Sequence, residues 1–109
     1  MHELGLAQEI VEIIAERAAE KKVKRVILEI GKLSCVLPDS IRFCFDLCAE
    51  GTIAEGAELE ILQPPGRGLC RRCGAQFPLD SLLGRCACGS SDVDWAGGEE
   101  LKLKAVEIA

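Results

Sequence analysis

Four of the seven cysteines form two close pairs in one region of the chain. Two residues separate Cys70 from Cys73 in CRRCG, one residue separates Cys86 from Cys88 in CACG, and twelve residues separate the pairs. Four thiolates from two close pairs suit a tetrahedral zinc ion. A set with no open coordination position is typical of a structural site rather than a catalytic one. The spacing therefore predicts structural zinc at these four residues.

Other interpretations of the cysteines are weaker. A reducing cytosol and an odd number of cysteines both argue against a disulfide framework. The cysteine region is poor in apolar residues, which argues against packing in a core. Iron held by the same thiolates, as in a rubredoxin-like site, is an alternative to zinc. For Cys44 and Cys48 we expect packing instead, because they share the apolar face of a predicted helix; Cys35 lies in a loop and receives no role.

The N-terminus carries the only histidine of the chain, His2. Its imidazole, the free amine of Met1, and the amide and carboxylate of Glu3 could together form a planar, nitrogen-rich ligand set. Such a set suits Ni(II) or Cu(II), and the ligand types alone do not choose between these metals. The alternative is a frayed terminus without function.

Regular elements on both sides of the cysteine region must position these groups. Apolar residues at helical spacing predict an amphipathic helix over residues 4–21, and Pro38 and Gly51 bound a second helix. Alternating apolar and polar residues predict strands over 23–31, 57–62 and 100–109. The expected apolar face of the first helix is Leu6, Ile10, Ile13, Ile14 and Ala18, and that of the second is Ile41, Cys44, Phe45 and Cys48.

The second and last strands carry opposite charges beside their apolar faces. Glu58 and Glu60 lie on one, and Lys102 and Lys104 on the other, so we expect these two strands to pair antiparallel. The predicted fold is α+β: a small three-stranded mixed sheet with two helices on one face, plus an inserted zinc-ribbon-like module. The predicted domains are residues 1–64 with 99–109, which would bind nickel, and the module 65–98 inserted between two strands.

Composition excludes several functional classes. The formal charge of the 109 residues is -5, which does not suit binding to a nucleic-acid backbone. No apolar run reaches the roughly 18 residues that span a bilayer, and no secretory signal is apparent, so we expect a cytoplasmic protein. A single terminal histidine cannot form a Ser-His-Asp set, and no glycine-rich phosphate loop is present. We therefore do not expect an enzyme.

Nearly the whole chain resembles one known family. The segments MHELGLAQEI, VKRVILEIGKLSCVLPDSIRFCFD and AELEILQPP, followed by the four-cysteine region, are similar to the HypA/HybF family of hydrogenase nickel-insertion proteins. The resemblance implies a metallochaperone that binds one Ni(II) through His2, with the adjacent amides and Glu3. It also implies zinc at Cys70, Cys73, Cys86 and Cys88.

The resemblance implies partners as well. The family delivers nickel to the precursor of the [NiFe]-hydrogenase large subunit, in some cases serves urease maturation, and works with a HypB-type GTPase. A homodimer is a candidate oligomeric state. The chain departs from the family pattern at its second cysteine pair, which is usually CxxC. If Cys88 aligns with the end of that motif, Arg85 stands where a cysteine is expected, which makes ligation by Cys86 the assignment for a structure to test.

A zinc-ribbon adaptor that binds another protein is the alternative function, with His2 incidental. Residues 66–95 contain four arginines and three aspartates, which is no basic footprint for nucleic acid. Trp95 and Phe77 would form only a thin stacking platform.

Overall fold

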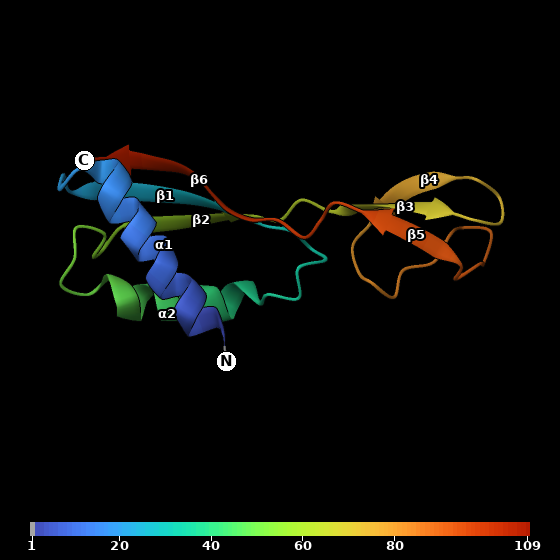
Figure 1. The fold of residues 1–109 in the computed structure, drawn as a ribbon, viewed down its shortest axis with the longest axis horizontal. Coiled ribbons are helices and arrows are strands. Elements are labelled where there is room, and N and C mark those ends of the chain that lie inside the picture. Colours follow the sequence, from blue (N-terminus) through green and yellow to red (C-terminus); the bar gives the residue numbers. More distant parts are fainter. Residues whose placement is uncertain (1) are drawn as a thin grey trace. The chain divides into compact units, whose positions relative to one another are not determined.

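The structure is a computed structural model that describes residues 2–109, except for the side chain of His2. Its strands form two three-stranded sheets, in the strand orders β2-β1-β6 and β4-β3-β5 (Figure 1). The predicted α+β class, with two helices and a separate cysteine-bearing module, is confirmed. The elements are α1 (His2–Ala18), β1 (Val23–Ile30), α2 (Pro38–Ala49), β2 (Glu58–Leu62), β3 (Gly66–Cys70), β4 (Gln76–Leu79), β5 (Val93–Ala96) and β6 (Leu101–Ile108).

The chain divides into two compact units. The first contains residues 1–28, 36–61 and 102–109, and the second contains 29–35 and 62–101. The segment Glu29–Cys35, which begins with the last two residues of β1, thus belongs with the cysteine region rather than with the helices. Within the described part of the chain, neither helix is long and apolar enough to cross a membrane.

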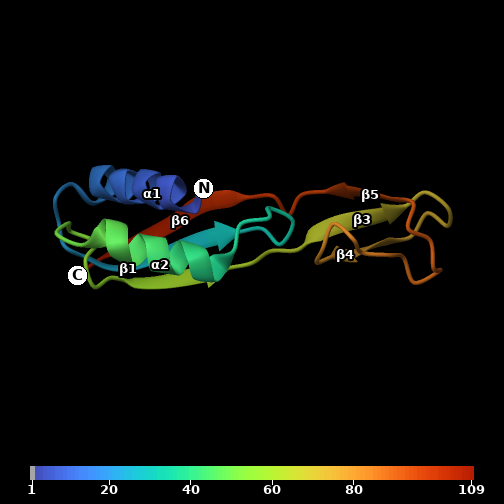
Figure 2. The same ribbon diagram turned by 90° about the horizontal axis from the view of Figure 1, so that it is seen from below.

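Strand β1 is the centre of the mixed sheet, with β2 parallel to it on one side and β6 antiparallel on the other (Figures 1 and 2). A helical crossover through α2 returns the chain so that β2 lies beside β1 in the same direction, as the connection of parallel strands requires. Backbone hydrogen bonds beside the two ends of β1 agree with these directions. On the β2 side, the amide of Val23 donates to the carbonyl of Ile53, and the amide of Lys32 donates to the carbonyl of Pro64. On the β6 side, the amide of Ala109 donates to the carbonyl of Lys22, and the amide of Gly31 donates to the carbonyl of Glu100.

The expected pairing of the second strand with the last is therefore wrong. Strands β2 and β6 lie on opposite sides of β1 and do not touch as a ladder. The base that meets Glu60 is Arg25 of β1, whose Nη2 lies 2.7 Å from Oε1 of that carboxylate. The Nη1 atom of Arg25 also lies 3.9 Å from Glu107 in β6. A glutamate on β2 can form an ion pair with a basic residue on either candidate neighbour, β1 or β6. The charge pattern alone therefore could not identify the neighbouring strand.

Both helices lie on the same side of this sheet and pack against each other (Figure 2). The face that α1 buries includes the expected Ile10, Ile14 and Ala18. It differs from the expected face elsewhere, because Ile13 is 40% exposed and Leu6 is half-buried, whereas Ala7 and Val11 are buried. The expected face of α2 is buried except at Cys48, which is half-buried. The buried core of the first unit includes Ala7, Ile10, Val11, Ile14, Ala18, Val23, Val26, Leu28, Ile41, Phe45, Ala49 and Leu103.

The second sheet is antiparallel around β3. Gly68 of β3 lies opposite Phe77 of β4 and Trp95 of β5. A Cβ at Gly68 would lie 2.7 Å from the Phe77 ring, so this ring occupies the space that a side chain on β3 would need. Strand β3 ends at Cys70, which places the first cysteine of the module at the end of the central strand.

Candidate metal centre

The four cysteines of the second unit converge on one point. Their sulfur atoms all lie within 4.8 Å of one another. Cys70 and Cys88 are 3.7 Å apart, and Cys73 and Cys86 are 3.5 Å apart. A tetrahedral zinc ion with bonds of about 2.3 Å places its sulfur ligands about 3.8 Å apart. The donor set and its dimensions therefore fit zinc. Among the described residues, no other group of three or more possible ligands gathers in this way.

The first knuckle is a tight turn at the end of β3. The amide of Cys70 donates to the carbonyl of Ala75, and the amide of Gly74 donates to the carbonyl of Cys70, both at 2.9 Å. Gly74 has a φ of +77°, a left-handed backbone conformation that is unfavourable for residues other than glycine. The turn aims the amide of Cys73 at the Cys70 sulfur, 3.4 Å away.

The second knuckle repeats this design with one residue fewer. The amide of Cys86 donates to the carbonyl of Ser90 at 3.1 Å, and the amide of Gly89 donates to the carbonyl of Cys86 at 2.9 Å. Gly89 is also left-handed, with a φ of +93°. The shortened CxC pair thus closes its loop by the same two kinds of hydrogen bond and still delivers both sulfurs. Arg85 is exposed, and Cys86 takes the place in the cluster that the sequence assigned to it.

Cys70 and Cys86 differ as acids. The amide of Cys73 donates to the Cys70 sulfur and is the main reason that the Cys70 pKa falls to about 6. The amide of Cys88 acts on Cys86 in the same direction, but burial and the neighbouring sulfurs together raise the Cys86 pKa to about 12. At neutral pH the cluster therefore contains both a thiolate and a thiol. A divalent cation that binds here must displace the proton of Cys86.

Sequence reasoning missed three charged residues that contact one another beside the cluster. Arg71, inside the first pair, donates through Nε to Asp94 at 2.9 Å, and its Nη1 lies 3.6 Å from Asp92. The sequence does contain a signal for this contact. Arg71 lies between two predicted ligands, and Asp92 and Asp94 follow the second cysteine pair at alternate positions. Alternate residues of a strand share a face, so two such acids can meet one guanidinium.

The predicted N-terminal site lies largely outside the described residues. Met1 and the side chain of His2 belong to the part of the chain that the structure does not describe. The backbone of His2 begins α1, and Glu3 in its first turn is only 8% exposed. A carboxylate in the first turn of a helix is favoured by the helix dipole. Nickel ligation by Met1, His2 and Glu3 stays a prediction.

The other three cysteines do not join the four-cysteine cluster. Cys44 is buried on the core side of α2, as expected. Cys48 is half-buried, and burial raises its pKa, as does the nearby Cys44. Cys35 is exposed and has a φ of +63°.

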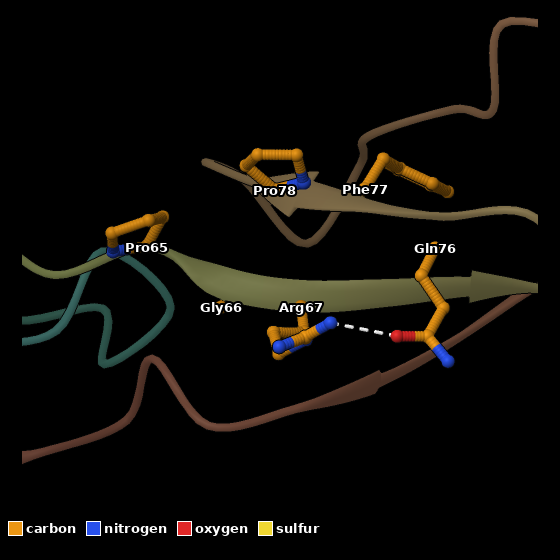
Figure 3. A pocket seen from close by; sticks show the side chains of 6 residues that line it. All are labelled: Pro65, Gly66, Arg67, Gln76, Phe77 and Pro78. Atoms are coloured by element: carbon orange, nitrogen blue, oxygen red, sulfur yellow. Dashed lines mark hydrogen bonds between the residues drawn. The ribbon is translucent and has the colours of Figure 1, made fainter.

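A surface pocket of about 310 Å³ lies elsewhere in the second unit, on β3 and β4 (Figure 3). Arg67 donates to the side-chain oxygen of Gln76 at 2.7 Å beside it. None of the predicted metal ligands lines this pocket. Its lining residues are Pro65, Gly66, Arg67, Gln76, Phe77 and Pro78.

Comparison with known proteins connects these features. A family model described as "Hydrogenase/urease nickel incorporation, metallochaperone, hypA" matches residues 1–108. The chain belongs to the HypA family. It is 57% identical over 108 residues to the hydrogenase maturation factor HypA of Nostoc punctiforme, covering 99% of this chain and 96% of that protein. It is 44% identical over 109 residues to the HypA of Geobacter sulfurreducens, covering 99% of both chains.

Solved structures of HypA proteins have the same fold. One described as "Solution structure of HypA protein" aligns with a TM-score of 0.68 at 26% identity, over all of this chain and 97% of that chain. The nickel metallochaperone HypA from Helicobacter pylori aligns with a TM-score of 0.67 at 24% identity, over 99% of this chain and 97% of that chain. The resemblance in the sequence is thus confirmed. HypA is a family of metallochaperones that handles nickel, and the four-cysteine cluster supports a zinc site beside that role.

Proposed function

We propose that this chain binds one Ni(II) at its N-terminus and delivers it during the maturation of [NiFe]-hydrogenase, and in some settings of urease. The observation that carries the proposal is the match of the nickel-incorporation family model, which begins at residue 1 and therefore includes the MHE segment. Nickel here is cargo, which the protein must release as well as bind.

The proposed nickel ligands are His2, the amine of Met1 and the neighbouring amides, with Glu3 as a further donor. Amine, amide and imidazole nitrogens together favour the planar geometry of Ni(II). A ligand set at a chain terminus can be reached by a recipient site without unfolding of the core. This accessibility suits delivery, whereas a storage site would enclose its metal.

The proposed zinc ligands are Cys70, Cys73, Cys86 and Cys88. Zinc would join two loops that are twelve residues apart and so would stabilise the module. The convergence of the four sulfurs supports this assignment. Residues 65–98 would then act as the zinc module and residues 1–64 with 99–109 as the nickel domain.

The proposed partners are a HypB-type GTPase and the precursor of the hydrogenase large subunit, and a second copy of the chain is a candidate for self-association. Nickel delivery to an enzyme precursor before its export or assembly would take place in the cytoplasm. Neither nucleic acid nor a membrane has a part in this proposal.

Nickel titration of the zinc-loaded chain tests the N-terminal site. The wild type is compared with His2→Ala and with a variant carrying one extra N-terminal residue, which moves the terminal amine. One extra residue at the C-terminus is the matched control for the added mass. We expect both N-terminal changes to weaken nickel binding and alter its absorption spectrum, and the control to leave both unchanged.

Unchanged nickel binding in both N-terminal variants would rule out the terminal site. The zinc-ribbon adaptor would then be the better interpretation, because it needs neither His2 nor a free amine. Loss of nickel binding only in Cys35→Ser would move the site to that residue.

A further inference from the structure

Arg71 connects the first cysteine knuckle to the strand that follows the second. Its guanidinium donates to the Asp94 carboxylate from both Nε and Nη2, and its Nη1 lies 3.6 Å from Asp92. Its backbone amide also donates to the carbonyl of Asp92 at 3.0 Å. Four contacts from one residue thus reach the segment that contains Asp92 and Asp94. We call these contacts the Arg71 clamp.

The clamp completes a path of hydrogen bonds between the two knuckles. The Ser90 hydroxyl, which belongs to a buried residue, accepts from the amide of Asp92 at 3.1 Å, and the Ser90 carbonyl accepts from the amide of Cys86. Asp92 in turn is held by Arg71, the residue next to Cys70. The path runs from Cys86 to Cys70 through protein groups alone. The two halves of the cluster are therefore joined without a metal ion.

Such a connection reduces the entropy cost that metal binding would otherwise include. Twelve residues separate Cys73 from Cys86, and drawing two loops together costs conformational entropy. If the protein has already closed the loops, this cost does not reduce the metal affinity. Groups that hold the ligands of a metal in place commonly change metal affinity by about 10-fold to 100-fold.

The chemistry of the clamp suits arginine in particular. A planar guanidinium can donate to one carboxylate from two nitrogens and still reach a second, which an ammonium group cannot copy. The clamp lowers the pKa of Asp94, because the Arg71 side chain donates to its carboxylate. The side chains are about half exposed, so the clamp adds little to global stability, and its effect is expected on the geometry of the knuckles.

We propose that Arg71 is a positioning residue for the metal centre, and that its clamp on Asp92 and Asp94 assembles the two cysteine knuckles before zinc arrives. The inference rests on the proposed zinc ligation by the four cysteines. Arg71 does not touch the metal. It acts through the positions of the cysteines.

The chain provides a matched control. Arg72 lies in the same knuckle and carries the same charge, and it forms no ion pair with any residue that the structure describes. Zinc affinity of the full chain is measured by competition with a chromophoric chelator for the wild type, Arg71→Ala, Arg72→Ala and Arg71→Lys. We expect Arg71→Ala to weaken zinc binding about 10-fold, Arg72→Ala to change it less than about 2-fold, and Arg71→Lys to restore only part of the loss.

Cobalt(II) provides a readout that a general loss of structure would not reproduce. The Arg71→Ala chain should keep the absorption bands of tetrahedral thiolate coordination, because all four ligands remain, but should lose cobalt to a chelator faster than the wild type. The exchanged pair Arg71→Asp with Asp94→Arg should regain part of the affinity. The difference between wild type and Arg71→Ala should shrink in high salt.

The outcomes separate this proposal from the one on which it rests. A wild-type chain that binds no zinc, or a Cys86→Ser variant that binds as tightly as the wild type, overturns the zinc ligation and the clamp together. Normal zinc binding with equal affinities for Arg71→Ala and Arg72→Ala overturns the clamp alone. If Arg71→Ala does not fold, Asp94→Asn takes its place, and wild-type zinc affinity in Asp94→Asn overturns the clamp as well.

Discussion

Gly31 lies so close to Gly98 that a Cβ on Gly31 would be 2.1 Å from the Gly98 carbonyl oxygen. A Cβ on Gly98 would in turn be 2.6 Å from the amide nitrogen of Gly66. Three segments of the second unit therefore meet with no side chain between their backbones. The amide of Leu33, whose side chain is buried here, donates to the Gly98 carbonyl at 2.7 Å and holds the junction together.

Gly31→Ala should destabilise the protein strongly. The new methyl group would overlap backbone atoms, which cannot rotate away as a side chain can, and overpacking of this kind costs about 1–3 kcal/mol or more. Gly5→Ala is the matched control, because a Cβ at Gly5 in α1 meets nothing within 4 Å. A helical Gly→Ala change should stabilise by up to about 1 kcal/mol. Thermal and urea unfolding of the zinc-loaded chains would measure both effects, and equal unfolding curves for the two variants would contradict the junction.

Truncation of two adjacent isoleucines in α1 should destabilise the protein to very different extents. Ile14 is fully buried, so Ile14→Ala should cost about 2–5 kcal/mol through lost contacts and a cavity. Ile13 is 40% exposed, so Ile13→Ala should cost less than about 1 kcal/mol. Urea unfolding of the two variants, which differ in composition from the wild type by the same change, compares the sites directly. A larger loss at Ile13 would show that the other face of the helix is buried.

This pair shows how far helical periodicity can predict the fold. Ile10, Val11, Ile13 and Ile14 fit two overlapping apolar stripes, and spacing favours both equally. Which stripe is buried depends on how α1 packs against α2, and the spacing of residues within α1 carries no information about that packing. The position of β1 between β2 and β6 was missed for the same reason, because it depends on which strands become neighbours.

The convergence of the four cysteines was predictable because its signal is chemical rather than positional. Four cysteines in two close pairs are typical of a metal site, so Cys86 could be named in spite of the shortened spacing. The support around the cluster was not predictable in the same way. Arg71 and Asp94 are 23 residues apart, and only the antiparallel register of β3 and β5 brings them together.

Arg25 and Glu60 should show a measurable coupling energy, unlike Glu60 and Lys104. The first pair joins neighbouring strands at 2.7 Å, and partly exposed pairs of this kind contribute about 0.2–1 kcal/mol. Glu60 and Lys104 lie on strands that β1 separates. Double-mutant cycles with alanine, measured by urea unfolding, should give a coupling energy for the first pair and a value near zero for the second. A larger coupling between Glu60 and Lys104 would favour direct pairing of β2 and β6.

Zinc affinity should fall as the pH falls, and more steeply below about pH 6. Zinc displaces protons from thiols, so each protonated cysteine lowers the apparent affinity. Cys86, with a pKa of about 12, keeps its proton in the metal-free chain at any working pH, so zinc displaces that proton at pH 7.5 and at pH 5 alike. Cys70, with a pKa of about 6, is mostly thiolate at pH 7.5 and mostly thiol at pH 5. Cys70 should therefore add close to one further proton to the number released per zinc at the lower pH.

Calorimetric titration in buffers of different ionisation enthalpy measures this number of protons directly. The comparison is between pH 7.5 and pH 5 on the same metal-free chain, and Arg72→Ala is a control whose proton count should match the wild type. The same number of protons at both pH values would mean that the Cys73 amide does not hold Cys70 as a thiolate. In that case the first knuckle of the metal-free chain would not lower the Cys70 pKa, whereas the Arg71 clamp rests on the contacts of Arg71 with Asp92 and Asp94 and is tested by the zinc affinities of the Arg71 and Arg72 variants.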